Sequence, residues 1–162
     1  MRKLGFLLAF SIFMLSSFSV FQIDKNAFYK ALSAGSEEII DSELKGLGQA
    51  RQSSQVSAYQ GALLMKKAGF VKGVKGKVKI FKLGAKKLEE EIDKNASNVE
   101  YRFLRLTIQE HAPGILHYNK ELNKDKAAII TGFEKLDPTL KSVIASYAQS
   151  SKVLSESDLR GK

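Results

Sequence analysis

The 162-residue sequence has no cysteine, no tryptophan, two prolines and two histidines. Without cysteine, the chain cannot form a disulfide, hold zinc through thiolates or use a thiol as a nucleophile. His111 and His117 stand on either side of a Pro-Gly pair, whereas a helical metal site needs histidines one turn apart. We therefore expect surface or turn histidines, and neither a metal nor another cofactor.

Motifs for catalysis are also missing. The glycines of residues 69–76 are not followed by Gly-Lys-Ser/Thr, so they do not make a phosphate-binding loop, and the sequence contains no Gly-x-Ser-x-Gly. Neither histidine has an indicated partner for general acid or base work. These absences favour a non-catalytic protein over an enzyme.

Residues 1–19 have the layout of a secretory signal peptide. Two basic residues precede an apolar run at residues 4–15, and Ser17 and Ser19 supply the small side chains that precede a cleavage site. An uncleaved anchor is the alternative, because residues 4–23 are mostly apolar and about as long as a bilayer crossing requires. We expect cleavage after Ser19. Export without disulfides is typical of a periplasmic or extracellular bacterial protein.

Residues 20–162 are predicted to form a single helical domain, because no linker-like segment divides them. Asp24, Ser36 and the Asp137-Pro138 pair indicate helix starts. Apolar residues recur at helical spacing between these signals. Further helices are expected over residues 54–68, 77–93, 97–110, 115–122 and 124–136, with a loop at 69–76 and a capping box formed by Ser97 and Glu100.

The predicted fold is all-α, an array of short antiparallel helical hairpins. Its expected core consists of Phe81, Leu88, Ile92, Phe103, Leu106, Ile130, Phe133, Ile144 and Tyr147.

The stretch from Lys77 to Glu110 resembles part of a tetratricopeptide repeat. It has Ala85, Leu88 and Ile92 on one predicted helix, then an Asn-Ala-Ser-Asn turn and a second helix. The resemblance implies stacked helical hairpins and peptide binding in a helix-lined groove. The segment RFLRLTIQEHAPGILHY also looks like small exported bacterial helical proteins with no assigned activity.

One helix presents a polar stripe on an otherwise apolar sequence. Arg102, Arg105 and Gln109 fall within about 60° of one another around the helix axis. Two guanidiniums and an amide in this arrangement suit a carboxylate or phosphate ligand. Alternatively, the arginines pair with the acids of residues 89–91 on the preceding helix.

A run of lysines without any acid covers residues 66–87. The chain has a formal net charge of +9 at pH 7, and this run suits anionic lipid or another polyanion. Nucleic acid is disfavoured, because the run lacks arginine and its two aromatic residues, Phe70 and Phe81, are better explained as core. The alternative is a solvated face balanced by the acids of residues 89–91. The candidate basic patch consists of Lys72, Lys75, Lys77, Lys79, Lys82, Lys86 and Lys87.

Together these patterns favour an exported, non-catalytic helical protein that acts as a protein or peptide interaction module in the bacterial envelope. Peripheral binding of anionic lipid or polyanion through the Lys66–Lys87 run is the second hypothesis. An enzyme of unknown class is the third.

Overall fold

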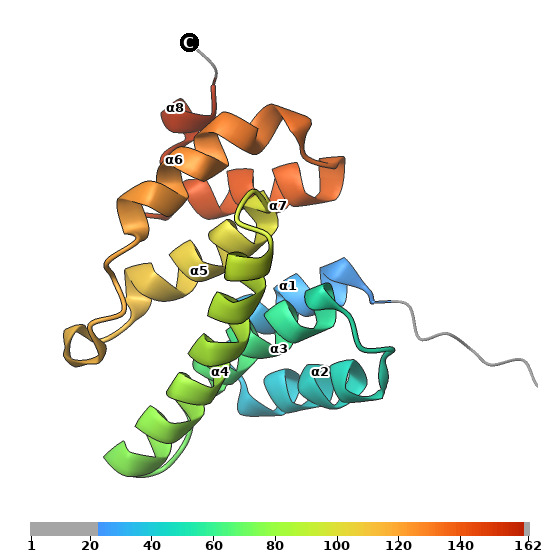
Figure 1. The fold of residues 1–162 in the computed structure, drawn as a ribbon, viewed down its shortest axis with the longest axis vertical. Helices are drawn as coiled ribbons and strands as arrows, with labels where there is room; N and C mark the ends of the chain where they lie inside the picture. Colours follow the sequence, from blue (N-terminus) through green and yellow to red (C-terminus); the bar gives the residue numbers. More distant parts are fainter. Residues whose placement is uncertain (1–22, 161–162) are drawn as a thin grey trace, which may run out of the picture.

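The computed structural model describes residues 23–160, which fold into α-helices and short 3₁₀ turns without a β-strand (Figure 1). The prediction of an all-α fold is confirmed. The predicted signal peptide lies outside the described residues. Within the described range, no helix combines the length and the apolar character that crossing a bilayer demands.

The helices follow one another closely along the chain. They are α1 (Lys25–Ser33), α2 (Glu37–Gln49), α3 (Ser54–Lys67), α4 (Val74–Lys94), α5 (Val99–His111), η1 (Gly114–Leu116), α6 (Leu122–Gly132), η2 (Phe133–Lys135), α7 (Pro138–Ala148) and α8 (Glu156–Leu159).

Two helix starts form as the local sequence predicts. The Asp24 carboxylate accepts hydrogen bonds from the first backbone amides of α1, at 2.9 and 3.2 Å. Asp137 accepts from the amide of Leu140 at 3.0 Å, and Pro138 occupies the first position of α7. In both cases a side-chain oxygen satisfies an amide that has no partner within the helix.

Two predicted boundaries around α4 and α5 are wrong. Helix α4 begins at Val74 rather than Lys77, because Gly73 adopts a φ of 75° and turns the chain just before it. The Ser97–Glu100 capping box is absent: Asn98 caps α5 instead, accepting from the amide of Tyr101 at 3.1 Å. Glu100 is thereby free to bond elsewhere.

The connection after α5 also differs from the prediction. In place of a helix over residues 115–122 there is a single 3₁₀ turn, η1, and α6 begins only at Leu122. His117 ends the turn with a left-handed φ of 49°, a conformation that a continuous helix does not allow. Helix α2 is not interrupted by its two glycines, Gly46 and Gly48, and continues to Gln49.

The core is built around a close contact between α3 and α4. Gly61 of α3 and Gly84 of α4 face each other, and a β-carbon on Gly84 would lie 2.5 Å from the Gly61 carbonyl oxygen. On the other side of α3, the ring of Tyr59 stacks on Phe28 of α1 with centroids 3.6 Å apart. Helix α3 is therefore covered on both sides, which fixes where its neighbours lie.

Most of the predicted core is correct, with one residue wrong. Six of the nine predicted side chains are buried, and Phe133 and Tyr147 pack against them while partly exposed. Ile130 is the error, because it is 38% exposed, whereas its neighbour Ile129 is fully buried. Asp125, one turn before Ile129, is also fully buried, so the inward face of α6 lies about 100° from the predicted one.

Candidate functional site

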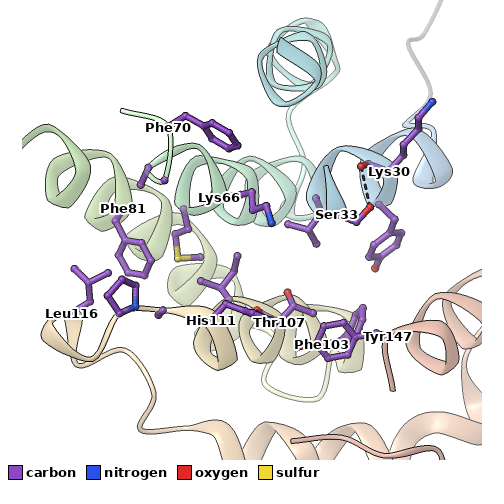
Figure 2. A pocket seen from close by; sticks show the side chains of 18 of the residues that line it. Lys30, Ser33, Lys66, Phe70, Phe81, Phe103, Thr107, His111, Leu116 and Tyr147 are labelled. Carbon is purple, nitrogen blue, oxygen red and sulfur yellow. Dashed lines mark hydrogen bonds between the residues drawn. The ribbon is translucent and has the colours of Figure 1, made fainter. Parts of the chain in front are cut away.

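A groove of about 1100 Å³ runs between two groups of helices. One wall comes from α1, α3 and the first half of α4, and the other from α5, η1 and α7. Figure 2 shows Phe81, His111 and Leu116 close together at one end, with Phe103 and Tyr147 further along. Elements that are distant in the sequence therefore converge on a single site.

Aromatic and aliphatic side chains form the floor of the groove. Phe81 of α4 meets Tyr118 edge to face, with centroids 5.2 Å apart. Phe103 of α5 meets Tyr147 of α7 in the same way at 5.4 Å. These contacts hold the lining rings in fixed orientations. The other apolar residues of the lining are Leu32, Met65, Ala68, Phe70, Val74, Val78, Ile108, Ala112, Pro113, Ile115, Leu116 and Val143.

The polar residues of the lining are cationic or neutral. Lys30, Lys66 and Lys77 all contribute, and no aspartate or glutamate lies among the described lining residues. Lys77 donates to the carbonyl oxygen of Gly69 at 3.0 Å. In the described part of the chain, Lys30 and Lys66 make no ion pair. Their ammonium groups leave the groove with an uncompensated positive rim.

His111 is the one imidazole of the groove. Its Nδ1 lies 3.0 Å from the carbonyl oxygen of Thr107, one turn earlier in α5. This contact requires a proton on Nδ1, so in the neutral ring Nε2 is a free acceptor. The other histidine, His117, is exposed in the turn after η1. Both therefore lie in surface or turn positions.

The polar stripe predicted as a binding site lies in the interior. Arg102, Arg105 and Gln109 are 8%, 4% and 3% exposed, and none of them lines the groove. The two arginines share one partner, Asp125 of α6, which is fully buried. Asp125 could not be recognised as this partner from the sequence, because it stands in a run of ordinary polar residues.

Arg105 is the centre of this buried network. Its Nε and Nη2 bind the two oxygens of Asp125 at 2.6 and 2.7 Å, and its Nη1 binds Glu89 at 2.5 Å. Burial disfavours the charged guanidinium, but the bonds and charges of Asp125 and Glu89 outweigh that effect and raise the pKa of Arg105. The expected alternative, pairing with acids of residues 89–91, is realised through Glu89.

Arg102 completes the network. Its Nη1 lies 3.1 Å from Asp125, and its Nε and Nη2 both donate to the carbonyl oxygen of Ala96 at 3.2 Å. Gln109 has a buried Oε1 with no partner among the described residues. The network joins α4, α5 and α6, so the geometry fits a structural role for these arginines.

The lysines of the candidate basic patch are spread over the loop before α4 and over α4 itself. Lys75, Lys79, Lys82 and Lys86 are exposed and follow one stripe of the helix. Of these four, only Lys86 has an acidic partner in the described structure, Glu90 at 3.8 Å. The other members lie elsewhere: Lys72 precedes the helix, Lys77 reaches the groove and Lys87 binds Gln60 at 3.3 Å.

Glu110 ties the groove wall to the C-terminal segment. Its carboxylate accepts hydrogen bonds from the hydroxyl of Tyr147, from Ser151 Oγ at 2.6 Å and from the amide of Lys152 at 2.6 Å. Burial alone would raise its pKa, but these hydrogen bonds outweigh that effect and hold the pKa of Glu110 below its ordinary value. The ionised form of Glu110 therefore stabilises the fold.

This arrangement predicts an acid-dependent loss of stability. A pKa that is lower in the folded state gives stability that is present above the unfolded value of 4.5 and is lost as pH falls through the folded pKa. We expect Glu110→Gln to lower the free energy of unfolding by about 1 kcal/mol at pH 7, and the difference from wild type to shrink below pH ~4. Urea unfolding followed by circular dichroism at several pH values measures this difference.

Glu134→Gln is the matched control. Glu134 is exposed on η2 and binds only Lys141, at 2.9 Å, within the described chain. An exposed pair of this kind contributes about 0.5 kcal/mol or less. A Glu110→Gln variant with the same small and pH-independent effect would contradict the structural role of Glu110.

The described residues contain no group of three or more His, Asp or Glu side chains that could hold a metal ion. What the groove offers chemically is an apolar floor, neutral hydroxyls and a positive rim, which together suit non-covalent binding. Searches for similar proteins give no further guide: the chain matches no known protein-family model, no curated protein and no solved structure.

Proposed function

We propose that the protein is a non-catalytic interaction module whose groove holds an apolar segment of a partner protein or peptide. The observation that carries the proposal is the groove itself, which at about 1100 Å³ is as large as typical ligand-binding clefts and is mainly apolar. An amphipathic helix laid into such a groove would bury its apolar face against Phe81, Phe103 and Tyr147.

The rim determines which partner segment suits the groove. Lys30, Lys66 and Lys77 approach it, and no carboxylate is found among its described lining residues. An acidic flank on the partner helix would meet complementary charge along this rim, whereas a basic flank would be repelled. The preferred ligand is therefore a helix with leucine-like side chains on one face and glutamates on the other.

The order in which the helices pack supports this function. The main helix contacts include α3 with α4 and α5 with α6, pairs that are consecutive in the chain. Such pairs support the interpretation of the fold as an array of helical hairpins resembling tetratricopeptide repeats. The bacterial envelope remains the proposed location, on the basis of the sequence of residues 1–19.

A binding experiment with defined probes tests the groove. The probes are 8-anilinonaphthalene-1-sulfonate, an apolar anion that fluoresces when shielded from water, and a designed Leu/Glu amphipathic peptide. We expect the dye to bind the folded protein and the Leu/Glu peptide to displace it. A Leu/Lys peptide of the same pattern should displace it at least tenfold less well, given about 0.5–1 kcal/mol for each reversed contact with the rim.

A variant that fills the groove supplies the control. Ser146 is exposed on α7 and lines the groove, so Ser146→Trp places a large ring in it without disturbing the core. The same change at Ser97, which is exposed in the turn before α5, should leave binding unaltered. Equal dye and peptide binding by both variants would refute the groove as the site.

A further inference from the structure

Two highly exposed aliphatic side chains lie at one end of the groove. Val74, the first residue of α4, is 75% exposed, and Ile115 of η1 is 82% exposed. Both line the groove, and Figure 1 shows the start of α4 and the connection after α5 on the same side of the molecule, at the lower left. Isolated exposed aliphatics are common, but two that flank one opening define an apolar surface.

The charge around this opening has a single sign. Residues 66–88 include nine lysines and no acid, and residues 111–120 likewise contain no acid. Lys72, Lys75 and Lys79 are exposed beside Val74 in the sequence and make no ion pair in the described structure. We call Val74, Ile115 and these three lysines the mouth surface.

We propose that the mouth surface docks on an anionic phospholipid bilayer, with Val74 and Ile115 inserted at the level of the headgroups. The transfer of exposed aliphatic side chains out of water lowers the free energy. The lysines would extend their aliphatic stems along the interface and hold their ammonium groups among the lipid phosphates. Val74 and Ile115 belong to the groove lining but are highly exposed, and Lys72, Lys75 and Lys79 lie outside that lining. Docking therefore does not require a ligand in the groove.

A bilayer fits the mouth surface better than a soluble polyanion. Nucleic acid would be bound by lysine and arginine with stacking aromatic rings, whereas the centre of the mouth surface is aliphatic. A folded acidic protein is disfavoured by the shape of the surface, because Val74 and Ile115 project from two separate elements across an open groove. A deformable lipid surface can surround both projections at once.

The absence of tryptophan makes insertion directly observable. Because the chain has no other indole, the emission of an Ile115→Trp variant reports the surroundings of that position alone. Vesicles of phosphatidylglycerol and phosphatidylcholine should shift its emission to shorter wavelength, and vesicles of pure phosphatidylcholine should not. Ile130→Trp is the matched control, since Ile130 is an exposed isoleucine on α6 outside the groove lining, and its emission should not move.

The charge contribution is tested by two triple variants of equal net charge. Lys72→Gln/Lys75→Gln/Lys79→Gln should weaken partition onto the anionic vesicles by roughly a hundredfold at low salt, at about a fivefold loss per lysine. Lys45→Gln/Lys135→Gln/Lys152→Gln removes three exposed lysines elsewhere and should weaken it far less. High salt should reduce binding of the unaltered chain.

Several outcomes would overturn the proposal. One is an Ile115→Trp emission that fails to shift on anionic vesicles, or that shifts equally on zwitterionic ones. Another is equal weakening by the two lysine triples. Binding to heparin that depends on the mouth lysines, without any shift at Ile115→Trp on vesicles, would assign the surface to soluble polyanions instead. Ser146→Trp should leave vesicle binding unchanged, which separates this test from that of the groove.

Discussion

A Gly84→Ala variant is expected to lose about 3 kcal/mol of unfolding free energy. The added β-carbon would lie 2.5 Å from the carbonyl oxygen of Gly61 and 2.8 Å from the amide nitrogen of Met65. Both are backbone atoms of α3, so they cannot rotate away as the end of a side chain would. The two helices must separate, and the loss of packing outweighs the roughly 1 kcal/mol that alanine gains in helix propensity.

Gly48→Ala is the matched control for this prediction. Gly48 lies in the last turn of α2, and a β-carbon there would meet nothing within 4 Å. The same substitution should therefore leave stability unchanged or raise it by about 0.5 kcal/mol. Urea unfolding followed by circular dichroism measures the stability of both variants. Similar midpoints for Gly84→Ala and Gly48→Ala would show that α3 and α4 do not approach as closely as described.

The same contact matters for the groove. Helix α3 contributes Met65 and Lys66 to its lining, and α4 contributes Val78 and Phe81. Because Gly61 and Gly84 set the distance between these helices, they also set the width of one groove wall. Small residues here are thus a condition for the shape of the candidate site.

Signals that act over a few residues could be predicted from the sequence. Asp24 and Asp137 each cap the helix that follows them, and the periodic apolar residues of α4 and α5 are buried, among them Leu88 and Phe103. These features depend on the helical repeat and on hydrogen bonds between near neighbours. The sequence itself contains that information.

Features set by long-range contacts could not be predicted in this way. The groove is lined from six elements between α1 and α7, and no local pattern indicates that they meet. Phe81 and Phe103 have the spacing of ordinary core residues, and this spacing does not indicate that they also line a groove. The arginine stripe is a second feature that depends on long-range contacts. Arg102 and Arg105 share a helix face, but the spacing cannot say whether that face points to solvent or to Asp125.

Replacing Asp125 with alanine is expected to destabilise the fold by about 4 kcal/mol. The carboxylate is fully buried and binds Arg105 at 2.6 and 2.7 Å and Arg102 at 3.1 Å. Its removal leaves two guanidiniums, each less than a tenth exposed, without their shared carboxylate. Arg105 keeps Glu89, but Arg102 keeps only the carbonyl oxygen of Ala96. Thermal and urea unfolding would measure the loss, and Asp93→Ala, at an exposed position on α4, should cost less than about 0.5 kcal/mol.

A triple variant distinguishes an unpaired charge from a simple loss of contacts. In Arg102→Met/Arg105→Met/Asp125→Leu, the three buried charges are replaced together by apolar side chains of similar length. Glu89 keeps the hydroxyl of Tyr118 at 2.6 Å, and the carbonyl oxygen of Ala96, an exposed residue, can turn to water. Most of the stability lost in Asp125→Ala should therefore return, because apolar replacements of buried ion pairs are often neutral or better. A triple variant as unstable as the single one would mean that the geometry of the ion pairs, and not the penalty of an unpaired charge, holds α6 against α5. Binding of the dye in the groove should be unchanged in the triple variant, since none of the three residues lines it.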